Sequence, residues 1–132
     1  MKSLFNYAEE TRGFIVRVSV SFLPEQSEIE KGRWFWSYHI RIENEGDMAA
    51  QLLSRRWVIS DARGAKNLVE GEGVVGDQPV IKPGASYDYV SGCPLTTSSG
   101  EMVGSYTMIG EDGSRFEIAV PRFDLKMPFT QA

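Results

Sequence analysis

Long stretches in which apolar and polar side chains alternate constrain this chain more than any other feature of its sequence. In residues 34–43 one face consists of Trp34, Trp36, Tyr38, Ile40 and Ile42. Residues 14–22 alternate in the same way, with one face made of Phe14, Val16, Val18, Val20 and Phe22. A period of two residues is typical of a β-strand with one buried side. Both stretches are therefore predicted to be strands that turn these side chains into a core.

Weaker signals of the same kind continue along the chain. An apolar run from Leu52 to Ile59 follows the turn Asn44–Asp47 and is expected to return antiparallel. Further strands are expected at 87–90, 102–109, 115–120 and 123–125. The inward parity changes between the last two segments, with Pro121 at the change, and this predicts a bulge or kink there.

The pattern as a whole predicts an all-β fold. No segment of helical length repeats apolar residues at i, i+3, i+4 and i+7. Strands separated by turn signals are typical of a β-sandwich, and we expect about seven to eight antiparallel strands. The 132 residues suit a single domain, 1–132, in which 1–12 and 126–132 are expected to be loose termini.

Charge and cysteine content exclude several classes of function. The 14 Lys and Arg are outnumbered by 18 Asp and Glu, so the basic face that nucleic acid requires is not expected. No apolar run approaches the ~20 residues of a membrane-spanning helix, and the first residues lack the features of a secretory signal. The lone Cys93 cannot form an intrachain disulfide. These features predict a cytoplasmic protein that binds neither nucleic acid nor membrane.

No catalytic group emerges from the sequence. His39 is the only histidine and is expected on the outer face of its strand, and the sequence contains no G-x-S-x-G nucleophile motif to pair with it. One histidine and one cysteine are also too few for the common zinc sites. Cys93 precedes Pro94 and has no neighbouring basic residue in the sequence, so it is interpreted as a small buried apolar residue. The chain is therefore expected to hold no metal site and to be no enzyme.

One glycine-rich segment could bind a ligand. Gly71, Gly73 and Gly76 match the spacing G-x-G-x-x-G of dinucleotide-binding loops. Pro79 and Pro83 exclude the helix that such a loop requires, so the Rossmann interpretation fails. Two interpretations remain. The glycines serve turns on the sandwich surface, with at least one at positive φ, or their amides form an anion-binding nest.

Acidic neighbours weigh against the nest. Glu70, Glu72 and Asp77 would repel a bare phosphate unless a divalent cation such as Mg²⁺ or Co²⁺ lay between them. Any contribution of such a cation is expected to be weak, and no other cofactor is expected.

Four stretches together resemble the bacterial ApaG family, also called CorD. They are residues 36–44, 53–61, 71–79, and 91–95 together with 100–106. The resemblance extends from about Thr11 to Phe123 and departs from the family pattern at Arg56, where histidine is expected, and at Ser98, where proline is expected. It implies a sandwich of the immunoglobulin or fibronectin type III kind and places the family's glycine signature on Gly71, Gly73 and Gly76. It also implies a loose association with cobalt and magnesium tolerance, and protein binding as the usual role of the domain.

The function expected from the sequence is therefore a non-enzymatic interaction module with a protein partner. The alternative is a sensor of nucleotides or pyrophosphate, or a phosphate-ester enzyme, that uses the glycine loop with a divalent metal. The sequence does not decide the oligomeric state or the identity of the partner.

Overall fold

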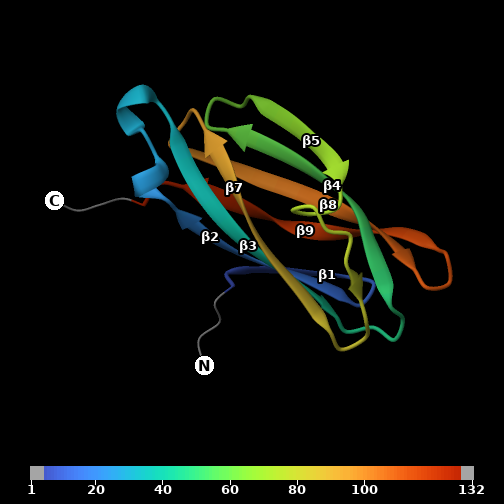
Figure 1. Cartoon of the computed structure of the whole chain (residues 1–132). Helices are drawn as coiled ribbons and strands as arrows, with labels where there is room; N and C mark the ends of the chain where they lie inside the picture. Colours follow the sequence, from blue (N-terminus) through green and yellow to red (C-terminus); the bar gives the residue numbers. More distant parts are fainter. Residues whose placement is uncertain (1–4, 129–132) are drawn as a thin grey trace.

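The fold is a sandwich of two antiparallel sheets, seen in a computed structural model that describes residues 5–128 (Figure 1). The first sheet has the strand order β1-β2-β3-β7, and the second has the order β5-β4-β8-β9, with β6 paired to β4. The strands are β1 (Tyr7–Thr11), β2 (Phe14–Phe22), β3 (Trp34–Asn44), β4 (Ala50–Asp61), β5 (Lys66–Glu72), β6 (Val80–Ile81), β7 (Ser86–Leu95), β8 (Ser99–Gly110) and β9 (Arg115–Lys126). Two single 3₁₀ turns, Pro24–Gln26 and Ile29–Lys31, lie between β2 and β3.

The prediction that β2 and β3 are strands with one buried apolar face is confirmed, and both strands belong to the first sheet. The two strands pair antiparallel, so that Val16 lies opposite Ile42 and Val18 opposite Ile40. These four side chains are fully buried, as is Trp36. The indole N–H of Trp36 donates a hydrogen bond of 2.9 Å to the carbonyl of Lys126, which ties the two sheets together.

The apolar run after Asn44, which was expected to return antiparallel, does not pair with β3. β4 pairs with β5, β6 and β8 and belongs to the second sheet, whereas β3 pairs with β2 and β7. The apolar faces of β3 and β4 pack against each other across the core instead of lying side by side. When the chain passes from one sheet to the other in this way, the apolar faces of β3 and β4 bury each other. The same alternation of residues would be seen if the two strands formed a hairpin.

The structure also corrects the extent of the loose termini. Tyr7–Thr11, which lies in the segment 1–12 that was expected to be loose, is the strand β1 and pairs with β2. Lys126, assigned to the loose segment 126–132, still belongs to β9. β1 was overlooked because an edge strand with Glu9 and Glu10 carries no apolar alternation. Residues 1–4 and 129–132 lie outside the described residues.

Two irregularities in the strands set which side chains face the core. The predicted change of face at Pro121 is confirmed: the pairing of β8 with β9 shifts register between Met102 and Gly104, and Val120 and Phe123 are both buried. A second shift, between Leu52 and Ser54 in β4, was not predicted. It turns the odd-numbered residues of the rest of β4 toward the core.

Candidate binding groove between the sheets

The two sides of the sandwich differ in how they are closed. On one side β1 lies against β9, and hydrogen bonds connect the Thr11 hydroxyl with the amide of Ala119 (3.1 Å) and the Tyr7 hydroxyl with the amide of Asp124 (3.3 Å). On the other side β7 and β5 are the outer strands of their sheets: within residues 5–128, β7 pairs only with β3 and β5 only with β4 (Figure 1). The sandwich is therefore open along β7 and β5.

A groove of about 900 Å³ lies at this open side. Its walls are mainly aromatic and apolar and include Trp34, Tyr38, Trp57, Ile59 and Val69. Acidic and basic side chains also line it, among them Glu28, Arg33, Asp61 and Lys66. A concave apolar surface with a few polar groups is the usual form of a binding site.

Of the basic residues that line the groove, Arg55 is partly buried, whereas Arg33 and Lys66 are exposed. Because of the register shift in β4, Arg55 lies on the same face of the strand as Trp57 and Ile59, and all three line the groove. Its Nη1 atom donates hydrogen bonds to the carbonyls of Glu72 (3.1 Å) and Gly73 (2.9 Å). The sequence alone did not single out this residue. The signal that could have identified it is its spacing of two and four residues from Trp57 and Ile59.

The glycine segment lies beside Arg55, and each glycine has a local structural reason. A side chain at Gly71 would come within 2.9 Å of the Arg55 guanidinium. Gly73 has a φ of 64°, and Gly76 has a φ of 85°. The expectation of glycines at positive φ is therefore confirmed. Gly71 itself belongs to β5 and has ordinary extended φ.

The amides of this segment are largely engaged within the protein. Val74 and Asp77 exchange two main-chain hydrogen bonds of 2.8 and 2.9 Å, and Gly73 donates to the carbonyl of Leu53 at 2.8 Å. Val75, with a φ of 43°, and Gly76 form the two central residues of this tight turn. Their positive φ values are those of a type I′ hairpin turn.

Two of the three carboxylates near the glycines have side-chain partners. Glu70 lies 3.9 Å from Arg56, and Asp77 accepts a hydrogen bond of 2.9 Å from the Tyr87 hydroxyl. Arg56, the position at which the resemblance leads one to expect histidine, is thus an exposed residue of the outer face. Within residues 5–128 no three His, Cys, Asp or Glu side chains gather as a metal site would require.

Burial controls the pKa values of Cys93, which lines the groove, and of two tyrosines in the core. It raises the pKa of the Cys93 thiol from its ordinary value of 9.0 to about 11, so the thiol stays protonated at neutral pH. Burial also raises the pKa of Tyr89 and of Tyr106, whose hydroxyls hydrogen-bond to each other. Cys93 is 3% exposed, which confirms its interpretation as a buried residue.

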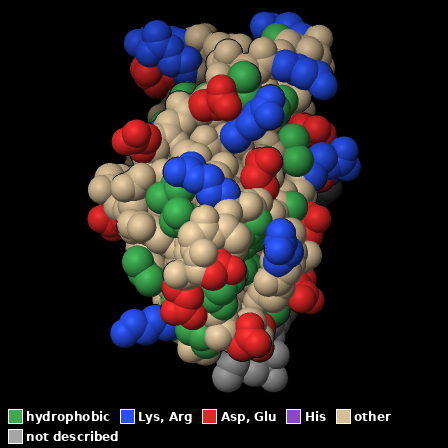
Figure 2. All heavy atoms as spheres, turned by 90° about the vertical axis from the view of Figure 1, so that its right-hand side faces the viewer, with side chains coloured by type: hydrophobic (Ala, Val, Ile, Leu, Met, Phe, Trp, Pro, Cys, Tyr) green, Lys and Arg blue, Asp and Glu red, His purple; other side chains and the backbone are tan. Residues whose placement is uncertain are grey.

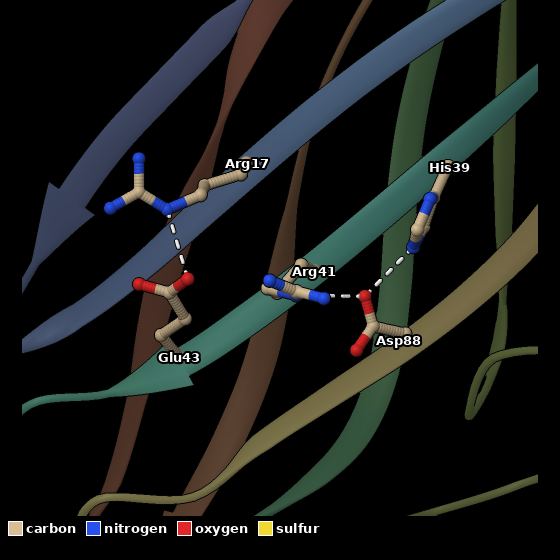
Figure 3. A network of polar contacts seen from close by, with 5 residues as sticks. All are labelled: Arg17, His39, Arg41, Glu43 and Asp88. Atoms are coloured by element: carbon tan, nitrogen blue, oxygen red, sulfur yellow. Dashed lines mark hydrogen bonds and ion pairs between the residues drawn. The ribbon is translucent and has the colours of Figure 1, made fainter. Parts of the chain in front are cut away.

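His39 lies on the outer face of the first sheet, as the alternation predicted. Its Nε2 atom is 2.7 Å from the carboxylate of Asp88, which also accepts a hydrogen bond of 2.9 Å from Arg41 (Figure 3). Arg17 and Glu43 form a second ion pair on the same face, at 3.0 Å (Figure 3). His39 therefore belongs to a surface network on the side of β3 opposite to the groove.

The side of the molecule with the β8–β9 hairpin carries acidic and basic side chains interspersed over its surface (Figure 2). The described residues contain no helix that is long and apolar enough to span a membrane.

The family match and the similar proteins found by comparison agree on one family. Residues 24–110 match the ApaG domain family. The chain is 54% identical over 122 residues to Protein ApaG of Brucella suis, a match that covers 92% of this chain and 94% of the relative. It is 51% identical to Protein ApaG of a Bradyrhizobium species, with 92% and 93% covered. A crystal structure from Bordetella pertussis, described as an ApaA protein, superposes with a TM-score of 0.86 at 42% identity and covers 89% of this chain and 95% of its own. None of these names states a catalytic activity.

Proposed function

Since this chain belongs to the ApaG domain family, we propose that it is a non-enzymatic interaction module that binds a protein partner in the groove between its sheets. The observation that carries the proposal is the groove itself, an open surface of about 900 Å³ lined by aromatic, aliphatic and charged side chains, with Arg55 among them. Aromatic side chains and arginine are enriched where proteins bind one another. The proposed site of action is the cytoplasm.

The chemistry of the groove supports binding more than catalysis. Cys93 stays protonated at neutral pH, and a thiol in that form is a poor nucleophile. His39 lies on the opposite side of β3 and is paired with Asp88. The proposed recognition uses the side chains of the groove and requires no cofactor.

Selection of peptides tests this function. Random dodecapeptides displayed on phage are selected on the wild-type protein, and the affinity of enriched peptides is measured by calorimetry. Asn67→Trp fills the mouth of the groove from β5, and we expect it to weaken binding at least tenfold. Val103→Trp adds a comparable side chain to β8, outside the groove lining, and should change the affinity less than twofold. Failure to enrich any peptide, or equal binding to both variants, would contradict the proposal.

A further inference from the structure

We propose that the partner segment binds as an added strand along β7, becoming a fifth strand of the first sheet, and that it places a carboxylate against Arg55. This inference rests on the proposed function and specifies the chemistry of the partner. The occupant is an extended peptide with an acidic residue.

The free hydrogen-bonding groups of β7 belong to its even-numbered residues. The amide of Asn44 donates to the carbonyl of Ala85 at 3.0 Å, so these two residues occupy the position of a hydrogen-bonded pair at the start of β7. Such pairs recur at every second residue of an antiparallel ladder. The unbroken register therefore joins Tyr87, Tyr89, Ser91 and Cys93 to β3, and turns the main-chain groups of Asp88, Val90 and Gly92 outward.

Two observations near the other end of β7 agree with this assignment. Pro94 has no amide hydrogen and occupies an even position of β7, where no amide is needed for a hydrogen bond to β3. Its partner Phe35 uses its carbonyl on the opposite side, where it accepts a 2.9 Å hydrogen bond from Leu23. The outward groups of β7 therefore run along the open side of the sandwich, next to the groove.

The second open edge, β5, is protected against strand addition. The amide of Asp61 donates to the carbonyl of Ala65, so the same reasoning turns the main-chain groups of the even residues of β5 outward. They are Lys66, Leu68, Glu70 and Glu72. Three of these four carry charge, a common device that discourages pairing at an edge.

β7 lacks this protection at its centre. Asp88 is already bound by His39 and Arg41. The next outward positions are Val90, which is 59% exposed, and Gly92. A β-branched side chain and a glycine leave the edge accessible, and extended peptides bind such edges through main-chain hydrogen bonds. We therefore assign the added strand to β7.

Arg55 determines the chemistry of the side chain that enters the groove. In an added strand, residues opposite Ser91 and Cys93 point to the same side as these residues, toward the groove that they line. Both hydrogen bonds of Arg55 use Nη1, and Nε and Nη2 donate to no residue within 5–128. Two remaining donors on one planar cation match a carboxylate. Asp or Glu at the inward position is therefore the expected residue.

A scan of N-methylated peptides tests strand addition directly. Each amide of one selected dodecapeptide is methylated in turn, and the affinity for the wild-type protein is measured. A strand added to β7 donates every second amide to the protein, so we expect binding to fall at least tenfold at alternate positions and less than threefold between them. Changing the acidic residue of the peptide to its amide should also weaken binding about tenfold.

Two proline variants of the protein compare the two open edges, one in β7 and a control in β5. Val90→Pro removes an outward amide hydrogen of β7, as Pro94 already does in the native strand, and we expect it to abolish the alternating pattern and weaken binding at least tenfold. Leu68→Pro removes an outward amide hydrogen of β5 and should leave binding within twofold. Thermal melting establishes that each variant is folded, and the peptide scan decides the matter if Val90→Pro is not.

The possible outcomes separate this inference from the proposed function. Peptides that Asn67→Trp blocks, but that show no alternation and no need for an acidic residue, would leave the groove as the binding site and overturn strand addition. Failure to enrich any peptide would overturn both. A dimer of the wild-type protein in sedimentation velocity that Val90→Pro separates would assign the β7 edge to a second copy of the chain and overturn the peptide as occupant.

Discussion

At the scale of single residues, Gly73 combines a φ of 64° with close contact to the main chain of the turn. A side chain at this position would overlap the carbonyl of Asp77. Gly64 also has a positive φ, of 87°, but nothing lies within 4 Å of the place where its side chain would be. The two positions therefore separate the cost of backbone conformation from the cost of collision.

We expect Gly73→Ala to lower the free energy of unfolding by about 3 kcal/mol, and Gly64→Ala by about 1 kcal/mol. The smaller figure is the ordinary penalty for a side chain in the left-handed region, and the larger one adds the displacement of Asp77. Urea denaturation measures both. Equal losses would mean that the turn moves away from the new methyl group at little cost.

The alternative function, a pyrophosphate site at the glycine loop, is tested at the same scale. Because the amides of Gly73, Val74 and Asp77 already donate to main-chain carbonyls, we expect pyrophosphate to shift their NMR signals weakly and without saturation at micromolar concentration. Mg²⁺ is included in a parallel titration, since it would screen Glu70, Glu72 and Asp77. Saturable shifts in the absence of metal would establish an anion site that this hydrogen bonding does not lead us to expect.

At the scale of elements, the connection from β3 to the second sheet depends on the fully buried Asn44. Its side-chain amide donates hydrogen bonds of 2.9 Å to the carbonyls of Met48 and Ile81, and its Oδ1 accepts one of 2.9 Å from the amide of Gly46. One side chain thus joins the end of β3, the turn that follows it and β6. From the sequence alone, Asn44 was expected only to begin a turn.

We expect Asn44→Ala to lower the free energy of unfolding by about 3 kcal/mol, because it leaves buried main-chain groups without partners. Gln51→Ala is the control. Gln51 donates a comparable 3.0 Å hydrogen bond to Gln78, but this bond is exposed to water, and its loss should cost about 0.5 kcal/mol. Chemical denaturation of both variants measures the difference. A loss below about 1 kcal/mol for Asn44→Ala would mean that water replaces these hydrogen bonds.

At the scale of the whole molecule, buried hydroxyl and thiol groups make stability depend on alkaline pH. The folded protein holds the pKa of Cys93 at about 11, and burial raises the pKa of Tyr89 and Tyr106 above 10.0. The unfolded chain releases these protons at the ordinary values, so above pH ~9 it binds fewer protons than the folded state. Stability therefore falls as the pH rises through that range.

We expect the free energy of unfolding to drop by about 2 kcal/mol or more between pH 8 and pH 11, measured by urea denaturation. In the double variant Tyr89→Phe with Tyr106→Phe both partners of the hydroxyl pair are removed together, so no buried donor is left alone. The decline should be shallower in this variant. An identical decline would assign the alkaline sensitivity to other groups.

The sequence alone determined the features that depend on neighbours along the chain. Alternation identified β2 and β3 and their buried faces, because a strand turns successive side chains to opposite sides. The change of parity at Pro121 located a bulge for the same reason. The glycines of the turn were expected at positive φ because few other residues adopt it at low cost.

Only the tertiary structure decided which strands share a sheet and what faces the groove. β4 carries the same alternation whether it pairs with β3 or packs across the core from it, and its partners lie far along the chain. Arg55 points inward because of a register shift that depends on the pairing with β8. β1 and β5 became recognisable as strands through their partners, since an edge strand exposes polar residues on both sides. The groove depends on this pairing of strands that are distant in the sequence, because it lies where the edges of β7 and β5 remain uncovered.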